Sequence, residues 1–252
     1  MQLFEKRKLL PLPQTIYPAT RTVEAFQTMQ QAGHIGKLVV SLAGSIDIAQ
    51  QPEPVLSKAA LRPDATYLVT GGTAGFGLES ACRIARRGAR HIILLSRRGI
   101  QDDLACEAVA NMRANGVTVI EAKADVSDKE ELFACLKTQL KNLPALGGII
   151  HAAAALDDTR ISSLDEKRIR NSLAAKVLGA LHLHAFSLEH PVDFFAMYSS
   201  VSSAFGNHGQ STYVAANSAL ESLGAWRRSQ GLPAQVIGWG PIADTGMMAR
   251  SS

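Results

Sequence analysis

From Ala65 onward, short apolar runs alternate with longer stretches of helical periodicity. The short runs are rich in Val, Ile and Leu and lack the alternation of apolar and polar residues expected of a half-exposed strand. This is typical of strands buried on both faces of a parallel sheet. Six runs predict such strands: TYLVT (66–70), HIILLS (91–96), VTVIEAKAD (117–125), GGIIHAAA (147–154), DFFAMYSS (193–200) and AQVIGWG (234–240).

Helical periodicity fills the intervals between these runs. It predicts helices near 78–88, 104–115, 129–141, 165–184 and 213–229. Strands that alternate with helices in this way form parallel sheets through right-handed crossovers. The pattern therefore predicts an α/β fold of the Rossmann type, a doubly wound parallel sheet with helices on both faces.

The N-terminal part of the chain has a different pattern. Residues 1–45 predict a strand at 14–17, a helix at 22–31 and a strand at 37–42, which is too little to form a core alone. Residues 46–64 carry three prolines among scattered polar residues and predict a linker. We therefore expect three segments: 1–45, 46–64 and a main domain at 65–252.

Composition narrows the class of protein. The chain has 252 residues, 46% of them hydrophobic and 19% charged, with a net charge of +4. No basic run reaches five residues, which disfavours a nucleic-acid surface. No apolar stretch is long enough to cross a membrane, and no signal-peptide pattern opens the chain. Three cysteines without a CxxC predict reduced, buried thiols in a cytoplasmic protein, and no cluster has metal-site spacing.

A glycine-rich loop follows the first strand of the main domain and precedes its first helix. Such a loop lets the backbone approach a pyrophosphate, and the free N–H groups at the helix start bind the anion. The alternative is an ordinary tight turn between strand and helix. The candidate cofactor-binding residues here are Gly71, Gly72, Thr73, Ala74, Gly75, Phe76 and Gly77.

The end of the second strand indicates which cofactor the loop would bind. A cofactor with a free ribose 2′-hydroxyl requires an acid at about this place. Here Ser96 and Arg97 stand instead, and a guanidinium suits a 2′-phosphate. We therefore expect NADPH rather than NADH; the alternative for Arg97 is a solvated basic turn.

Several ordered strings carry a resemblance to a known family. They are RGARHIILLSRRG (87–99), HAAAALDD (151–158), AAKVLGAL (174–181), MYSSVSSAFGNHGQSTYVAANSALESL (197–223) and VIGWGPIADTGM (236–247). Over residues 65–250 the chain resembles the ketoreductase domains of modular polyketide synthases and animal-type fatty-acid synthases, a branch of the short-chain dehydrogenases. The resemblance implies a catalytic set of Lys176, Ser200, Tyr213 and Asn217.

The proposed chemistry requires these residue types. When a ketone receives a hydride, its oxygen must gain a proton, which Tyr213 can supply. A tyrosine has an ordinary pKa of about 10, and a nearby ammonium such as that of Lys176 makes it a better acid. Ser200 would hold the carbonyl oxygen, and Asn217 would support a water or the lysine. Most short-chain dehydrogenases have lysine where this chain has Asn217; in the resembled branch the two residues exchange places.

Four further positions match the family's cofactor site. Asp125 and Val126 match residues beside the adenine ring, and Ala152 and Ala153 match small residues beside the ribose. The alternatives are a helix N-cap for Asp125 and simple packing for the two alanines. His151 is interpreted as a core histidine with satisfied hydrogen bonds.

The resemblance also suggests substrate and stereochemical determinants. Leu156, Asp157 and Asp158 resemble the signature of B-type ketoreductases, which form a D-configured hydroxyl, although two acids in a loop are usually just solvated. The A-type tryptophan is absent, and Phe205 stands at its position. Pro241 and Met247 match a stretch that flanks the nicotinamide and a mobile lid.

The string LPLPQTIYPATRTVEAFQTMQQAGHIGKLVV (10–40) looks like the tail of an enoyl reductase domain. Together these resemblances imply NADPH-dependent reduction of a β-ketoacyl thioester within a synthase. The implied partners are an acyl carrier protein, the enoyl reductase and a structural ketoreductase half. The alternatives are a free-standing reductase of small ketones and a non-catalytic half-domain that braces a synthase.

Overall fold

The computed structural model describes residues 13–41, 61–155 and 157–240. Contacts between Cα atoms divide the chain into two compact units, Met1–Ala59 and Ala60–Ser252. Each unit therefore has its own arrangement of strands and helices.

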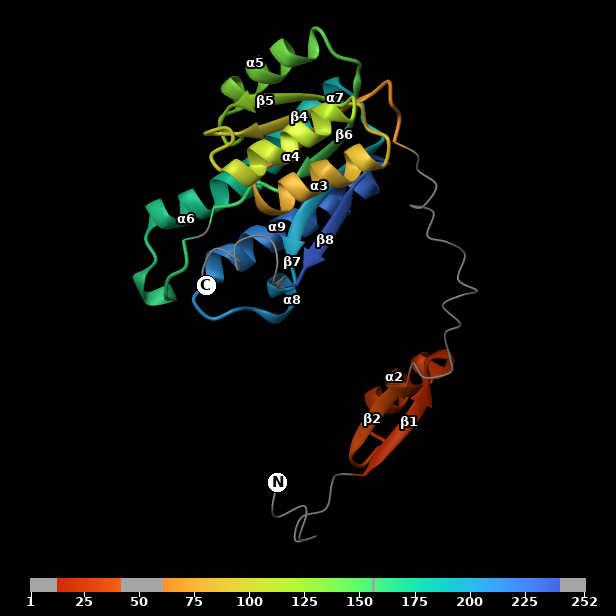
Figure 1. Ribbon diagram of the computed structural model, residues 1–252. Coiled ribbons are helices and arrows are strands. Elements are labelled where there is room, and N and C mark those ends of the chain that lie inside the picture. The colour runs from red at the N-terminus through yellow and green to blue at the C-terminus, as the bar shows by residue number, and fades with distance from the viewer. Residues whose placement is uncertain (1–12, 42–60, 156, 241–252) are drawn as a thin grey trace. The chain divides into compact units, whose positions relative to one another are not determined.

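A six-stranded parallel sheet forms the centre of the larger unit (Figure 1). Its spatial order is β5-β4-β3-β6-β7-β8, and every neighbouring pair is parallel. The order reverses between β3 and β6, which is where open α/β sheets bind ligands. The predicted doubly wound parallel sheet is therefore confirmed. The strands are β3 (Thr66–Thr70), β4 (His91–Ser96), β5 (Thr118–Lys123), β6 (Leu146–His151), β7 (Phe194–Ser200) and β8 (Gln235–Trp239).

Helices cover both faces of this sheet (Figure 1). Apolar residues of α3 and α4 pack on one face, and those of α5, α7 and α9 pack on the other. The helices are α3 (Gly75–Arg86), α4 (Asp103–Ala114), α5 (Lys129–Leu140), α6 (Glu166–Leu173), α7 (Gly179–Glu189), α8 (Ser202–Phe205) and α9 (Ser211–Ser229), with a short 3₁₀ turn η4 (Ile161–Ser163) and a π-helix η5 (Ala174–Leu178).

The two faces have separate cores because successive side chains of a strand point to opposite sides. In β3, Leu68 belongs to the cluster that includes Leu132 of α5 and Phe186 of α7. Its neighbour Val69 belongs to the cluster that includes Val109 of α4. Both strand residues are fully buried, as the unbroken apolar run predicts for a central strand.

The predicted helix at 165–184 differs from the observed structure. Asp165 caps α6 by accepting a hydrogen bond from the Arg168 amide at 2.8 Å, but the α-helix stops at Leu173. The π-helix η5 follows, and α7 then continues to Glu189. The widened turn was not predicted, because helical periodicity gives no signal for one inserted residue.

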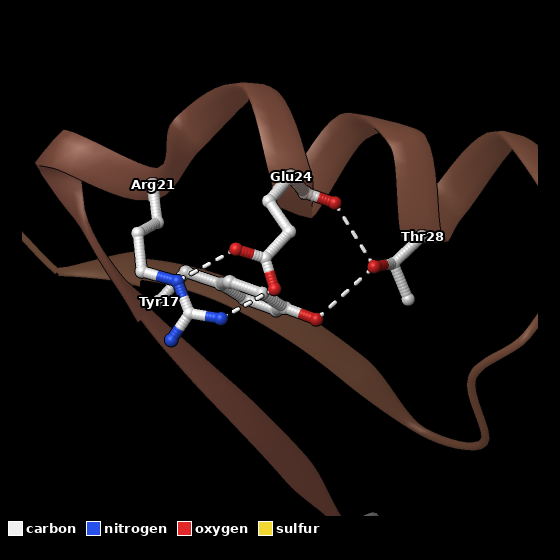
Figure 2. A network of polar contacts seen from close by, with 4 residues as sticks. All are labelled: Tyr17, Arg21, Glu24 and Thr28. Atoms are coloured by element: carbon white, nitrogen blue, oxygen red, sulfur yellow. Dashed lines mark hydrogen bonds and ion pairs between the residues drawn. The ribbon is translucent and has the colours of Figure 1, made fainter.

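The smaller unit contains β1 (Gln14–Pro18), the 3₁₀ turn η1 (Ala19–Arg21), α2 (Thr22–Gln30) and β2 (Lys37–Ser41), and its two strands are parallel. Figure 2 shows the polar network that joins β1 to α2. The Tyr17 hydroxyl lies 3.1 Å from Thr28 Oγ1, and the Arg21 guanidinium pairs with the Glu24 carboxylate. Within residues 13–41, few apolar residues are buried, whereas several large ones are exposed: Ile16, Val23, Phe26, Met29 and Ile35.

The three cysteines are free, but the prediction that all of them are buried is wrong. Cys106 is exposed, and Cys82 and Cys135 are partly buried. Each lies on an amphipathic helix, where a small apolar side chain is tolerated near the boundary between core and solvent. Among the residues that the structure describes, no helix combines the length and apolar character needed to cross a bilayer.

Candidate active site

A cavity of about 860 Å³ lies along the edge of the sheet where the parallel strands end. It collects residues from the ends of all six strands and from α3, η5, α8 and α9. Its volume is in the upper part of the usual range for ligand sites, about 300–1,000 Å³. The candidate residues that line it are Gly71, Thr73, Ala74, Gly75, Phe76, Gly77, Ser96, Arg97, Asp125, Val126, Ala152, Ala153, Lys176, Ser200 and Tyr213.

The glycine-rich loop lies between the end of β3 and the start of α3. Gly71 has φ of +67°, and a Cβ there would lie 2.9 Å from the Ala152 carbonyl carbon. A Cβ on Gly77 would lie only 2.1 Å from the Gly71 carbonyl oxygen. Both positions therefore require glycine, and their tight packing turns the N-terminus of α3 toward the cavity. Gly72 packs against Val69 of β3 instead of lining the cavity.

Ser96 and Arg97 follow β4 at the rim of the cavity. The Ser96 hydroxyl oxygen accepts a hydrogen bond from the Gly99 amide at 2.9 Å, which closes the turn. The Arg97 side chain is 64% exposed, and its Nη1 lies 4.0 Å from Asp125 Oδ2. Among the residues that the structure describes, this is the only charged contact of Arg97, so the guanidinium is held loosely beside the cavity and its donors can bind an anion.

Asp125 follows β5 and closes a local turn. Its Oδ1 accepts hydrogen bonds from the Ser127 amide at 2.9 Å and the Ser127 hydroxyl at 2.6 Å. Partial burial opposes ionisation, but these hydrogen bonds and the charge of Arg97 lower the pKa of Asp125 below its usual value. The N-cap of α5 is Asp128, which accepts from the Glu131 amide, so the alternative role of Asp125 as that cap is wrong.

Lys176 lies in the π-helix η5 and is only 4% exposed, so it is a buried charge and not a surface charge of a helix. Its ammonium donates a hydrogen bond to the Tyr198 carbonyl at 2.8 Å. The same ammonium lies 4.9 Å from the centroid of the Tyr213 ring. Burial lowers the pKa of Lys176 to about 8, because the charged form loses its hydration.

Ser200 ends β7 at the floor of the cavity. Its Oγ accepts a hydrogen bond from the Ser202 amide at 3.2 Å, which leaves the hydroxyl proton free to be donated. Glu221 of α9 holds the residues on either side: its Oε1 accepts from Ser199 Oγ at 2.8 Å and contacts the Ser203 hydroxyl. Sequence analysis did not single out Glu221, because its spacing from Ser200 carries no motif.

Asn217 lies one turn after Tyr213 on α9 and is fully buried. Its Nδ2 donates to the Tyr213 carbonyl at 2.8 Å, and its Oδ1 has no hydrogen-bond partner among the described residues. Asn217 therefore lies behind Tyr213 and does not line the cavity, unlike the other three catalytic candidates.

The two loop acids are tied to helices rather than placed in the cavity. Asp157 Oδ1 accepts from Arg168 Nη1 at 2.8 Å and borders a separate cavity of about 420 Å³. Asp158 Oδ2 accepts from Gln210 Nε2 at 2.8 Å, and Gln210 lines the main cavity. Leu156, Pro241 and Met247 lie outside the described residues.

An aromatic wall completes the cavity, and sequence analysis did not predict it. Phe76 stacks on Trp239 with ring centroids 5.0 Å apart, and Tyr198 packs edge-on against both rings. Phe205, at the expected position of the A-type tryptophan, lines the cavity and is 87% exposed. These residues come from four different elements, α3, β7, α8 and β8, so only the fold brings them together.

The sheet order and the glycine loop at the cavity define a Rossmann-type α/β domain with a candidate dinucleotide site at the carboxyl ends of its strands. Residues 65–244 match the family model of the KR domain. The chain belongs to this ketoreductase family, whose members act on CH–OH groups with a nicotinamide cofactor.

Known relatives agree with this assignment. A highly reducing polyketide synthase of Alternaria cinerariae is 37% identical over 244 residues, which is 95% of this chain and 10% of that protein. A reducing polyketide synthase of Cochliobolus heterostrophus is 33% identical over all 252 residues, again 10% of its length. A solved structure of A-type ketoreductases from a modular polyketide synthase superposes with a TM-score of 0.69 at 37% identity, covering 75% of this chain and 40% of that one. The chain thus spans about a tenth of the length of these curated relatives.

Proposed function

We propose that this domain reduces a carrier-bound β-ketoacyl thioester to a β-hydroxyacyl thioester, with NADPH as the reductant, inside a polyketide synthase. The observation that carries the proposal is the buried Lys176 ammonium, which faces the Tyr213 ring in a cavity that Ser200 also lines. A buried charge beside a phenol is costly to maintain, and it serves the donation of a proton.

The residues of the cavity fit the cofactor. The N-terminus of α3 and the glycine loop, whose tight packing requires glycine at positions 71 and 77, supply backbone N–H groups for the pyrophosphate. Arg97 would bind the 2′-phosphate, Asp125 and Val126 would flank the adenine, and Ala152 and Ala153 would lie beside the ribose. The bound NADPH supplies the hydride that reduces the ketone carbon.

The protein's own side chains bind the ketone oxygen and supply its proton. Ser200 is free to donate its hydroxyl proton to that oxygen, which holds the carbonyl in line. Tyr213 donates its phenolic proton to the oxygen as negative charge develops there, and the Lys176 ammonium stabilises the resulting phenolate. Asn217 fixes the Tyr213 backbone and presents its buried Oδ1 to a water molecule that passes protons to the lysine.

We further propose B-type stereochemistry, with a D-configured hydroxyl. The proposal rests on the loop Leu156–Asp158 and on Phe205 in place of the A-type tryptophan. Overall similarity does not decide the stereochemical type, because a structure of A-type ketoreductases is also among the similar proteins. Asp158 is anchored to Gln210, three positions before Tyr213, so the loop is tied to the residue that would protonate the substrate.

The acyl carrier protein, the enoyl reductase and the structural ketoreductase half are the proposed partners. The relative that matches over all 252 residues includes the N-terminal segment in its alignment. Residues 13–41 of that segment bury few apolar side chains, as expected for the tail of a larger enoyl reductase domain.

The test is an assay of the purified chain with a β-ketoacyl N-acetylcysteamine thioester and NADPH, followed by chiral chromatography of the product. We expect oxidation of NADPH and a D-configured β-hydroxyacyl product. An L-configured product would overturn the B-type assignment alone. Binding of NADPH without turnover of the thioester, but with turnover of a simple ketone such as trans-1-decalone, would favour the free-standing reductase. Absence of NADPH binding would favour a structural half-domain.

A further inference from the structure

His151 lies between the glycine loop and the π-helix that carries Lys176. It is the last residue of β6, its partner in the β3–β6 ladder is Thr70, and it is 1% exposed. Its Nδ1 lies 2.7 Å from Thr70 Oγ1, and its Nε2 lies 2.9 Å from the Lys176 carbonyl oxygen. One imidazole therefore joins the end of β3 to the backbone of the candidate catalytic lysine.

The two hydrogen bonds determine which nitrogen carries the proton. A carbonyl oxygen can only accept, so Nε2–H donates to Lys176, and Nδ1 of the neutral ring accepts from the Thr70 hydroxyl. Burial, together with the charge of Lys176, lowers the pKa of His151 to about 4. The ring thus stays neutral at physiological pH and acts as a fixed donor to Lys176, not as a proton carrier.

The hydrogen bond between His151 and Lys176 lies at the irregular π turn of the helix. The Gly179 amide reaches back to the Ala174 carbonyl, the five-residue step of a π turn, and Lys176 lies inside that turn. A Cβ on Gly179 would lie 3.1 Å from His151 Cε1 and 2.8 Å from Val126 Cγ1. The imidazole therefore packs directly against the helix backbone, and π turns of this kind occur often at functional sites.

The backbone of Lys176 decides where its ammonium can reach. The side chain extends from the π turn to the Tyr198 carbonyl and to the face of the Tyr213 ring. A shift or rotation of this turn would carry the ammonium away from Tyr213, because the bond to Tyr198 is the only hydrogen bond that the side chain makes among the described residues. A displacement of about 1 Å in a positioned group can lower a rate by about a hundredfold.

We propose that His151 is a positioning residue: by donating from Nε2 to the Lys176 carbonyl, it holds the π turn that aims the Lys176 ammonium at Tyr213. The proposal rests on the proposed ketoreductase function for its catalytic consequence. The positioning itself depends only on a hydrogen bond from one specific ring nitrogen, and that hydrogen bond does not rest on the proposed function.

Two isosteric substitutions separate the two hydrogen bonds. The amide of His151→Asn reaches about as far as Nδ1 and can keep the Thr70 contact, whereas the amide of His151→Gln reaches about as far as Nε2 and can donate to Lys176. Both remove the ring and lose similar packing. Val109→Ala, in the core on the opposite face of the sheet, is the control for lost packing alone.

The variants are compared by kcat, KM, melting temperature and the titration of Lys176 followed by NMR of its labelled side chain. We expect His151→Gln to keep kcat within about threefold of wild type and His151→Asn to lose at least about tenfold, with KM little changed. We expect the Lys176 pKa to rise in His151→Asn only, as the ammonium gains solvent. Val109→Ala should lower the melting temperature and leave the Lys176 titration unchanged.

Equal kcat values and equal Lys176 titrations in His151→Asn and His151→Gln would overturn the proposal, whatever their stability. If wild type itself failed to reduce the thioester, the proposed function would fail. The NMR titration would still decide whether His151 positions Lys176, so the two failures are distinguishable.

Discussion

The Lys176 ammonium lies 4.9 Å from the centroid of the Tyr213 ring, although α7, β7 and α8 lie between the two residues in the chain. Lys176 comes from a π turn buried against the sheet, and Tyr213 comes from the first turn of α9. The charge and the phenol meet because both elements pack at the carboxyl ends of β6 and β7. This relationship makes the proposed proton transfer open to direct tests.

Tyr213→Phe removes the proposed proton donor and keeps the ring. We expect kcat for the β-ketoacyl thioester to fall by at least about a hundredfold, since general acid catalysis contributes about 10²–10⁴. The dissociation constant of NADPH, measured by fluorescence, should stay within about twofold of wild type. A mutant with wild-type turnover would rule out Tyr213 as the acid.

The pH dependence of kcat should report Lys176. Its ammonium is lost as the pH rises through about 8, and with it the stabilisation of the Tyr213 phenolate. We expect wild-type kcat to fall above about pH 8, and Lys176→Met to be slow and nearly independent of pH across this range. Stopped-flow measurements with saturating NADPH from pH 6 to 10 provide the check; a wild-type rate that kept rising to pH 10 would contradict the role of the lysine.

Arg97→Ala should separate the two nicotinamide cofactors. Arg97 is held loosely at the rim of the cavity, and a charge-assisted hydrogen bond contributes about 1.5–3 kcal/mol. We expect NADPH affinity to fall by at least about tenfold while NADH affinity changes by less than about twofold. Titration calorimetry with both cofactors measures this, with exposed Arg170→Ala on α6 as a control. An unchanged preference would mean that another group binds the 2′-phosphate.

The neutral, buried state of His151 predicts a loss of stability in acid. Its pKa is about 4 in the folded protein, below the ordinary value near 6.5, so the unfolded chain binds the proton first as the pH falls. The stabilisation is complete above about pH 6.5 and is lost as the pH approaches 4. We expect the unfolding free energy of wild type, relative to His151→Gln, to decrease by about 3 kcal/mol between pH 7 and pH 4. Urea denaturation at several pH values tests this, and parallel curves for the two proteins would refute it.

Glu221→Ala should change the position of Ser200 indirectly, through the neighbouring residues that Glu221 contacts. The carboxylate holds Ser199 and Ser203, the residues on both sides of the Ser200 turn. We expect kcat to fall by about threefold to tenfold in Glu221→Ala and to recover in Glu221→Gln, whose amide oxygen can still accept both hydrogen bonds. Glu189→Ala, which breaks only an exposed ion pair with Lys137, should leave kcat unchanged.

Much of the fold could be predicted from local patterns. The six apolar runs became β3 to β8, with no end displaced by more than three residues, because burial on both faces leaves an unbroken apolar signal. The short helix α8 was missed, since four residues carry no period. The π turn at Lys176 was missed because one inserted residue leaves no signal in helical periodicity.

The sequence by itself determined the parallel sheet, the glycine loop and the identities of the candidate residues, because periodicity, glycine and the chemistry of each side chain are local properties. Only the tertiary structure decided which groups meet: the Lys176 charge at the Tyr213 ring, Asn217 behind that tyrosine, Glu221 on both sides of Ser200, and the two loop acids on Arg168 and Gln210. Those pairings depend on how the crossovers place distant strand ends side by side, and burial then lowers the pKa of Lys176.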